Sequence, residues 1–129
     1  MGVMRSLIIR YQKQCETRDD HPDEQLQSHY YKAGFDKVFQ IVEEWAKGRR
    51  DFTVESVSKE HGEIGIKLSK PPSLLVITVV SPRPFQTAVD FMISTEKSSV
   101  TGMYPTLKQL ISSYYQEIDR LLPNLGKKS

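Results

Sequence analysis

Apolar residues recur along this chain with two different periods. Between residues 35 and 47 they return every three or four positions, which places them on one stripe of an amphipathic helix that Gly48 ends. A second stripe of the same period predicts a helix from Pro105 to about Leu122, ended by Pro123. The apolar residues of the two stripes are Phe35, Val38, Phe39, Val42, Trp45 and Ala46 in the first helix and Leu107, Leu110, Ile111, Tyr114, Ile118 and Leu121 in the second.

Between the two helical segments, from Asp51 to Glu96, apolar and polar residues alternate in four short runs separated by turns that contain glycine or proline. A period of two predicts β-strands, and the apolar side changes at Val57, which predicts a bulge or the end of the first strand. Gly62 supplies the positive φ that a hairpin turn between the first two strands needs. The order of elements therefore predicts a two-layer α+β sandwich, in which a four-stranded antiparallel meander carries both helices on one face.

The opposite face of the predicted sheet is mixed in character rather than polar. An exposed apolar patch of this kind marks a dimer, a partner or a ligand surface. Alternatively, the first thirty residues fold across this face and cover it. The residues that the predicted register places on this face are apolar Leu74, Val76, Val80, Ala88 and Met92 and polar Glu55, Lys67, Thr78, Asp90 and Ser94.

The two ends of the chain carry less regular patterns. Residues 6–13 fit either an extra N-terminal strand or a short helix, because their apolar positions suit both periods. Residues 14–28 are polar, acidic and interrupted by Pro22, which predicts a loop. Residues 29–32 are expected to follow as a short edge strand, and residues 124–129 to form a flexible tail.

The composition fits a single domain over residues 1–129, with 38% hydrophobic and 26% charged residues. The net charge of +2 is unevenly distributed, since residues 15–29 carry one basic and five acidic side chains and residues 97–129 carry five basic and two acidic. A lone cysteine, Cys15, excludes an intramolecular disulfide and fits the cytoplasm. The longest apolar run, Leu74 to Val80, is far too short to span a bilayer, so no membrane partner is expected.

The acidic loop over 14–28 holds the residue types of a metal or thiol site. Thiolate, imidazole and carboxylate groups bind Zn(II) when they converge, although their spacing here matches no standard zinc site. A nucleophilic Cys15 would need a positioned base, for which His21 is the nearest candidate in sequence. The candidate ligands are Cys15, Asp19, His21 and His29.

A second candidate functional surface is expected around the last strand. A carboxylate in an apolar strand, such as Asp90, has a raised pKa suited to acid–base work, although an outward Asp on an amphipathic strand is the simpler interpretation. Arg83, His61 and Glu63 lie at turns from which they could reach Asp90. The basic residues after the first helix are not interleaved with the tyrosines and no nucleotide-binding motif occurs, so nucleic acid is not an expected partner.

The most distinctive fragments of the chain are Cys15-Glu16-Thr17-Arg18-Asp19-Asp20-His21-Pro22, Tyr30-Tyr31-Lys32, Val57-Ser58-Lys59-Glu60-His61-Gly62-Glu63-Ile64 and Arg83-Pro84-Phe85-Gln86-Thr87-Ala88-Val89-Asp90-Phe91, followed by Ser94-Thr95-Glu96. Together they resemble a family of small bacterial cytosolic proteins of unknown function over about residues 15–96. The likeness departs over Lys97 to Pro105. The resemblance implies a Gram-positive, cytosolic context and supplies no activity.

The leading interpretation is a non-catalytic cytoplasmic domain that works by binding, through the outer sheet face or the acidic loop. Its expected partner is a second copy of the chain or an unidentified protein or small molecule, and no cofactor is expected. The alternative is a metal-dependent or Cys/His-based enzyme that uses the acidic loop.

Overall fold

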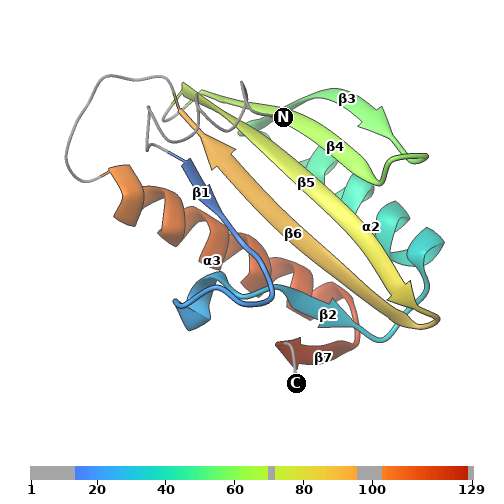
Figure 1. Cartoon of the computed structure of the whole chain (residues 1–129). Helices are drawn as coiled ribbons and strands as arrows, with labels where there is room; N and C mark the ends of the chain where they lie inside the picture. Colours follow the sequence, from blue (N-terminus) through green and yellow to red (C-terminus); the bar gives the residue numbers. More distant parts are fainter. Residues whose placement is uncertain (1–13, 70–71, 96–102, 128–129) are drawn as a thin grey trace.

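The computed structural model describes residues 14–69, 72–95 and 103–127 (Figure 1). Within these residues the chain has an α+β fold, in which seven strands form one antiparallel sheet accompanied by two α-helices and a short 3-10 helix. The elements in chain order are β1 (Gln14–Glu16), η1 (Glu24–Leu26), β2 (His29–Tyr31), α2 (Phe35–Gly48), β3 (Phe52–Ser58), β4 (Glu63–Ser69), β5 (Pro72–Arg83), β6 (Gln86–Ser94), α3 (Met103–Leu121) and β7 (Asn124–Lys127).

The sheet contains the predicted meander but is larger than it. Strands β3, β4, β5 and β6 are neighbours in chain order, and the other side of β6 pairs with both β1 and β2. Because β7 pairs with β2, β2 lies inside the sheet rather than at its edge. The predicted sheet of four strands is therefore smaller than the observed sheet of seven. The additional strands are short and are held by main-chain hydrogen bonds, so their sequences do not show an alternating apolar pattern.

Both α-helices pack on one face of the sheet, the inner face, as the predicted stripes require (Figure 1). Each helix begins and ends within two residues of its predicted bounds. One position of the second stripe was wrong, because Leu121 is 50% exposed and Leu122 is buried in its place. The core between the layers includes Ile64, Ile66, Leu75 and Ile77 of the sheet and Val38, Phe39, Val42, Ile111, Tyr114 and Ile118 of the helices.

The β3–β4 hairpin confirms both local predictions. The register of the pair shifts between Val54 and Ser56, which marks the bulge. Gly62 has a φ of 68°, and a Cβ there would lie 2.4 Å from the carbonyl oxygen of Val79. Conformation and space therefore both require glycine at this turn. The carbonyl of Gly62 in turn accepts a hydrogen bond from the N–H of Val79 at 2.7 Å, which attaches the turn to β5.

The segment predicted as a loop over 14–28 contains β1 and η1, so that prediction was wrong at both ends. The main chain of this segment closes on itself, because the N–H of Ser28 donates to the carbonyl of Arg18 and the N–H of Arg18 donates to the carbonyl of Leu26. Leu26 is fully buried, and Asp23 forms an ion pair with Lys108 of α3. The acidic loop is thus attached to the more basic C-terminal third of the chain.

The predicted tail over 124–129 was also wrong in part, since Asn124–Lys127 forms β7. Its partner is β2, with His29 opposite Lys127 and Tyr30 opposite Gly126. The main-chain groups of a polar segment can complete a sheet edge without an apolar pattern. The possible strand over 6–13 lies outside the described residues.

Candidate functional site

The outer face of the sheet, which no described helix covers, holds a strip of apolar side chains. Leu74 and Val80 of β5 are 44% and 48% exposed, and Val76 lies half-buried between them. The ladder places Val76 beside Met92 and Val80 beside Ala88 of β6. These residues, called the apolar strip below, are the ones that the sequence placed on this face. Residues 14–16 and 29–31 join the sheet beside β6 rather than crossing the strip.

Beside the apolar strip, the outward residues of β4 are Glu63, Gly65, Lys67 and Ser69. Gly65 lies opposite Val76 in the ladder, and a Cβ at Gly65 would lie 2.5 Å from Oγ of Ser56 on β3. Glu63 and Lys67 are exposed, and neither forms an ion pair with another described residue. This side of the strip therefore carries two charges of opposite sign around a position without a side chain.

On the other side of the strip, Asp90 pairs with Thr78 of β5. On its opposite edge it lies in the gap between the residues of β6 that pair with β1 and those that pair with β2. Its Oδ1 accepts hydrogen bonds from the hydroxyls of Thr17, at 2.7 Å, and of Ser28. Burial raises the pKa of Asp90 above its usual value, the two hydroxyls lower it in part, and the neighbouring carboxylates of Asp19 and Glu16 raise it further. Asp90 thereby fastens both ends of the acidic loop to the sheet.

Tyr30 and Asp19 extend this side of the outer face. Tyr30 lies opposite Ala88 in the ladder, and its hydroxyl donates to Oδ2 of Asp19 at 2.9 Å. Burial, together with the bond to Asp19, raises the pKa of Tyr30 to about 12, so its hydroxyl keeps its proton near neutral pH. The margin formed by β1 and β2 is therefore acidic.

Cys15 lies on the inner face, opposite Ile93, and is 1% exposed. Burial raises the pKa of its thiol to about 11, so the thiolate that a nucleophile requires is scarce near neutral pH. Asp90 belongs to the outer face, at a register position of the opposite sense. The structure therefore does not bring Cys15 and Asp90 together.

The two histidines among the predicted ligands have other contacts. Nδ1 of His21 accepts a hydrogen bond from the main-chain N–H of Asp23 at 3.0 Å. The ring of His29 stacks on Tyr115 with centroids 3.7 Å apart, and its Nδ1 lies 3.1 Å from Oδ1 of Asp119. Within residues 14–69, 72–95 and 103–127, no three His, Cys, Asp or Glu side chains are arranged to hold a metal ion.

The second predicted cluster is only partly assembled. Glu63 and Asp90 lie in one row of the outer face, with Thr78 between them. His61 belongs to the β3–β4 turn, which bonds to β5 at Val79, and Arg83 ends β5, so both lie toward the C-terminal end of β5, beyond the row of Glu63, Thr78 and Asp90. The structure thus joins Glu63 to the Asp90 row and leaves the two turn residues at the periphery.

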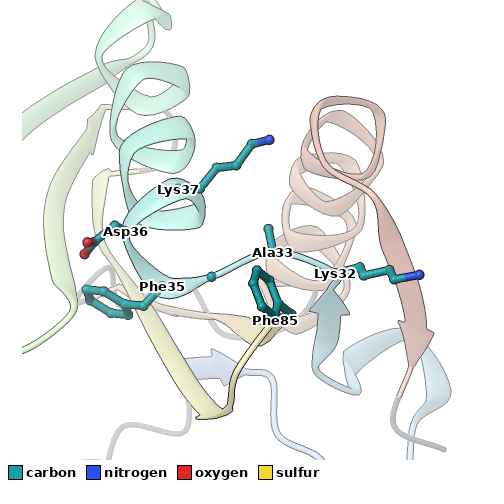
Figure 2. A pocket seen from close by; sticks show the side chains of 7 residues that line it. Lys32, Ala33, Phe35, Asp36, Lys37 and Phe85 are labelled. Atoms are coloured by element: carbon teal, nitrogen blue, oxygen red, sulfur yellow. The ribbon is translucent and has the colours of Figure 1, made fainter.

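A surface pocket of about 510 Å³ lies where α2 begins (Figure 2). Phe85, at the tip of the β5–β6 hairpin, forms one wall of the pocket and is 69% exposed. Its main chain has a φ of 60°. The side chains of Lys32 and Lys37 end well apart in Figure 2. The pocket therefore offers one exposed aromatic ring but no converging set of polar groups, which a specific small-molecule site requires.

No family model, curated protein or solved structure matches this chain. The resemblance to a bacterial family over residues 15–96 therefore stays a prediction. In the described part of the chain, no helix combines the length and the apolar character needed to cross a membrane.

Proposed function

We propose that this chain is a non-catalytic protein-binding module that contacts its partner through the outer face of the sheet. The apolar strip is the observation that carries this proposal. It lies at the centre of the face, between the charged residues of β4 and the acidic margin of β1 and β2. An apolar centre within a charged rim is the usual composition of a protein interface.

The site residues support binding rather than chemistry. The thiol of Cys15 is buried and protonated, and the hydroxyl-bonded oxygen of Asp90 serves to hold the acidic loop. A single buried cysteine fits a reducing compartment, so the cytoplasm is the proposed location. The resemblance over residues 15–96 adds a bacterial context to the same proposal.

Site-specific photocrosslinking in living cells tests the proposed surface. A benzophenone side chain replaces Val76 in one variant and Gln40, on the exposed side of α2, in a matched control. We expect a crosslinked protein product from position 76, and a loss of that product when Leu74→Glu is added. Equal products from both positions, or a product at position 40 alone, would contradict the proposal.

A further inference from the structure

On the outer face, β4 carries one negative and one positive side chain on either side of a glycine. Glu63 and Lys67 are both exposed, with Gly65 midway between them. Successive outward positions on a strand lie about 6.6 Å apart, so the two opposite charges are equally distant from Gly65. Consider a two-fold axis that lies above Gly65, parallel to the sheet and at right angles to the strand. It places Lys67 of one copy opposite Glu63 of the second copy.

Resting on the proposed function, we propose that the partner is a second copy of this chain, placed so that Lys67 of each copy pairs with the second copy's Glu63. The two outer faces pack against each other with their strands antiparallel. The axis follows the row in which Gly65, Val76 and Met92 are neighbours in the ladder. A two-fold interface repeats each contact, so this arrangement forms two ion pairs.

The row on the axis suits contact with its own copy. Val76 and Met92 are half-buried apolar residues, and each meets the same side chain of the second copy. Gly65 has no side chain and only the small side chain of Ser56 lies over it, so no large side chain separates the two sheets there. To either side of the axis, Leu74 faces the second copy's Thr78, since these positions lie one outward step above and below Val76. Such contacts fit the separation of about 10 Å between the sheets of a β-sandwich.

Two acidic residues are placed differently by this axis. Asp90 falls opposite the second copy's Ser94, so no second carboxylate faces it. Glu16 lies opposite Met92 at the rim, in the same row as the axis, and therefore approaches the second copy's Glu16. The arrangement thus predicts that Glu16→Gln strengthens the dimer, an effect specific to this axis.

The size of the face predicts a reversible complex. Five strand widths and seven residues of strand length cover roughly 550 Å² per copy, compared with about 800 Å² per partner in a standard interface. Weak and transient complexes have interfaces of this smaller size. The dimer is therefore expected to dissociate on dilution within the range from about 10 μM to about 1 mM.

Sedimentation velocity on the full chain over that range tests the proposal. Lys67→Glu and Glu63→Lys each replace two attractive pairs by repulsive ones, so each should weaken self-association by about tenfold. An equimolar mixture of the two variants should associate as heterodimers, and the double variant K67E/E63K should associate like the wild type. Lys37→Glu, the same charge change on the exposed side of α2, should have no effect.

Other results would overturn the proposal in distinguishable ways. A wild type that stays monomeric to about 1 mM excludes the second copy as partner, while the photocrosslinking result at Val76 still decides the proposed function. Association that Leu74→Glu abolishes but the paired charge variants do not restore means that the face is right and the axis wrong. Association unchanged by Leu74→Glu places self-contact on another surface, and circular dichroism of each variant confirms that it is folded.

Discussion

Both faces of β5 carry apolar residues, but the two α-helices cover only the inner face. Leu75 and Ile77 on the inner face are fully buried beneath the helices, whereas Leu74 on the outer face remains 44% exposed. Strand geometry determines which residues share a face, but only the rest of the fold determines whether that face is covered. Apolar residues in a strand therefore indicate a face that is covered, without indicating what covers it. On the inner face the helices cover β5, and on the outer face we propose that a partner does.

The largest difference between the faces is expected in stability. Ile77→Ala should lower the free energy of unfolding by about 2–5 kcal/mol, because it leaves a cavity in the core. Val76→Ala, one residue away on the outer face, should change it by no more than about 0.5 kcal/mol. Urea unfolding at low micromolar concentration, where self-association is minimal, measures both. Similar losses for the two variants would mean that the outer face is already covered within one chain.

A smaller loss of stability is expected at the rim of the inner face, where the guanidinium of Arg49 lies over the rings of Trp45, Phe52 and Tyr114. Its guanidinium carbon lies 4.7 Å from the ring centre of Phe52 and 5.2 Å from that of Tyr114, and its nitrogens donate to Asp51 and Glu117. Removal of these contacts by Arg49→Ala should lower the free energy of unfolding by about 1–2 kcal/mol.

Arg50→Ala is the matched control, because the neighbouring Arg50 is exposed. Its effect in the same urea titration should stay within about 0.5 kcal/mol. Arg49→Lys should fall between the two, since an ammonium group keeps the charge but loses the planar, two-pronged contact with Asp51. An Arg49→Ala variant as stable as the wild type would show that the inner face needs no cover at this rim.

Both helices, the hairpin turn at Gly62 and the membership of the apolar strip were predictable from the sequence. Each follows from a local rule: a helix repeats every 3.6 residues, a strand repeats every two, and a glycine permits a positive φ. These rules act over a few neighbours in the chain. They therefore identify faces correctly even where the extent of the sheet was wrong.

The contacts of the candidate site were not predictable, because they join distant parts of the chain. Asp90 bonds to Thr17 across 73 positions, and His29 meets Asp119 across 90 positions. The strands β1, β2 and β7 have three or four residues each, too few for a hydrophobic period to be visible. Cys15 shows the consequence, since its placement on the inner face depends on the pairing of β1 with β6.

The smallest expected effect is a change of stability with pH, which should have opposite signs for Asp90 on the outer face and Asp51 at the inner rim. Because its pKa is raised, folded Asp90 keeps its proton to a higher pH than the unfolded chain does. The free energy of unfolding therefore loses the contribution of Asp90 as the pH rises from about 4 through the folded pKa. Asp90→Asn removes this loss and can still accept the hydrogen bonds of Thr17 and Ser28, so its stability relative to the wild type should increase with pH.

Asp51, at the inner rim, should behave in the opposite way. Its hydrogen bonds with Arg49 hold its pKa below the usual range, so its contribution to stability is present above about pH 4 and is lost as the pH falls through the folded pKa. Asp51→Asn should therefore be less stable than the wild type near neutral pH and should approach it on acidification. Urea titrations between about pH 3 and pH 7 give both slopes, and equal signs for the two variants would show that the hydrogen bonds from Thr17 and Ser28 outweigh burial and lower the pKa of folded Asp90.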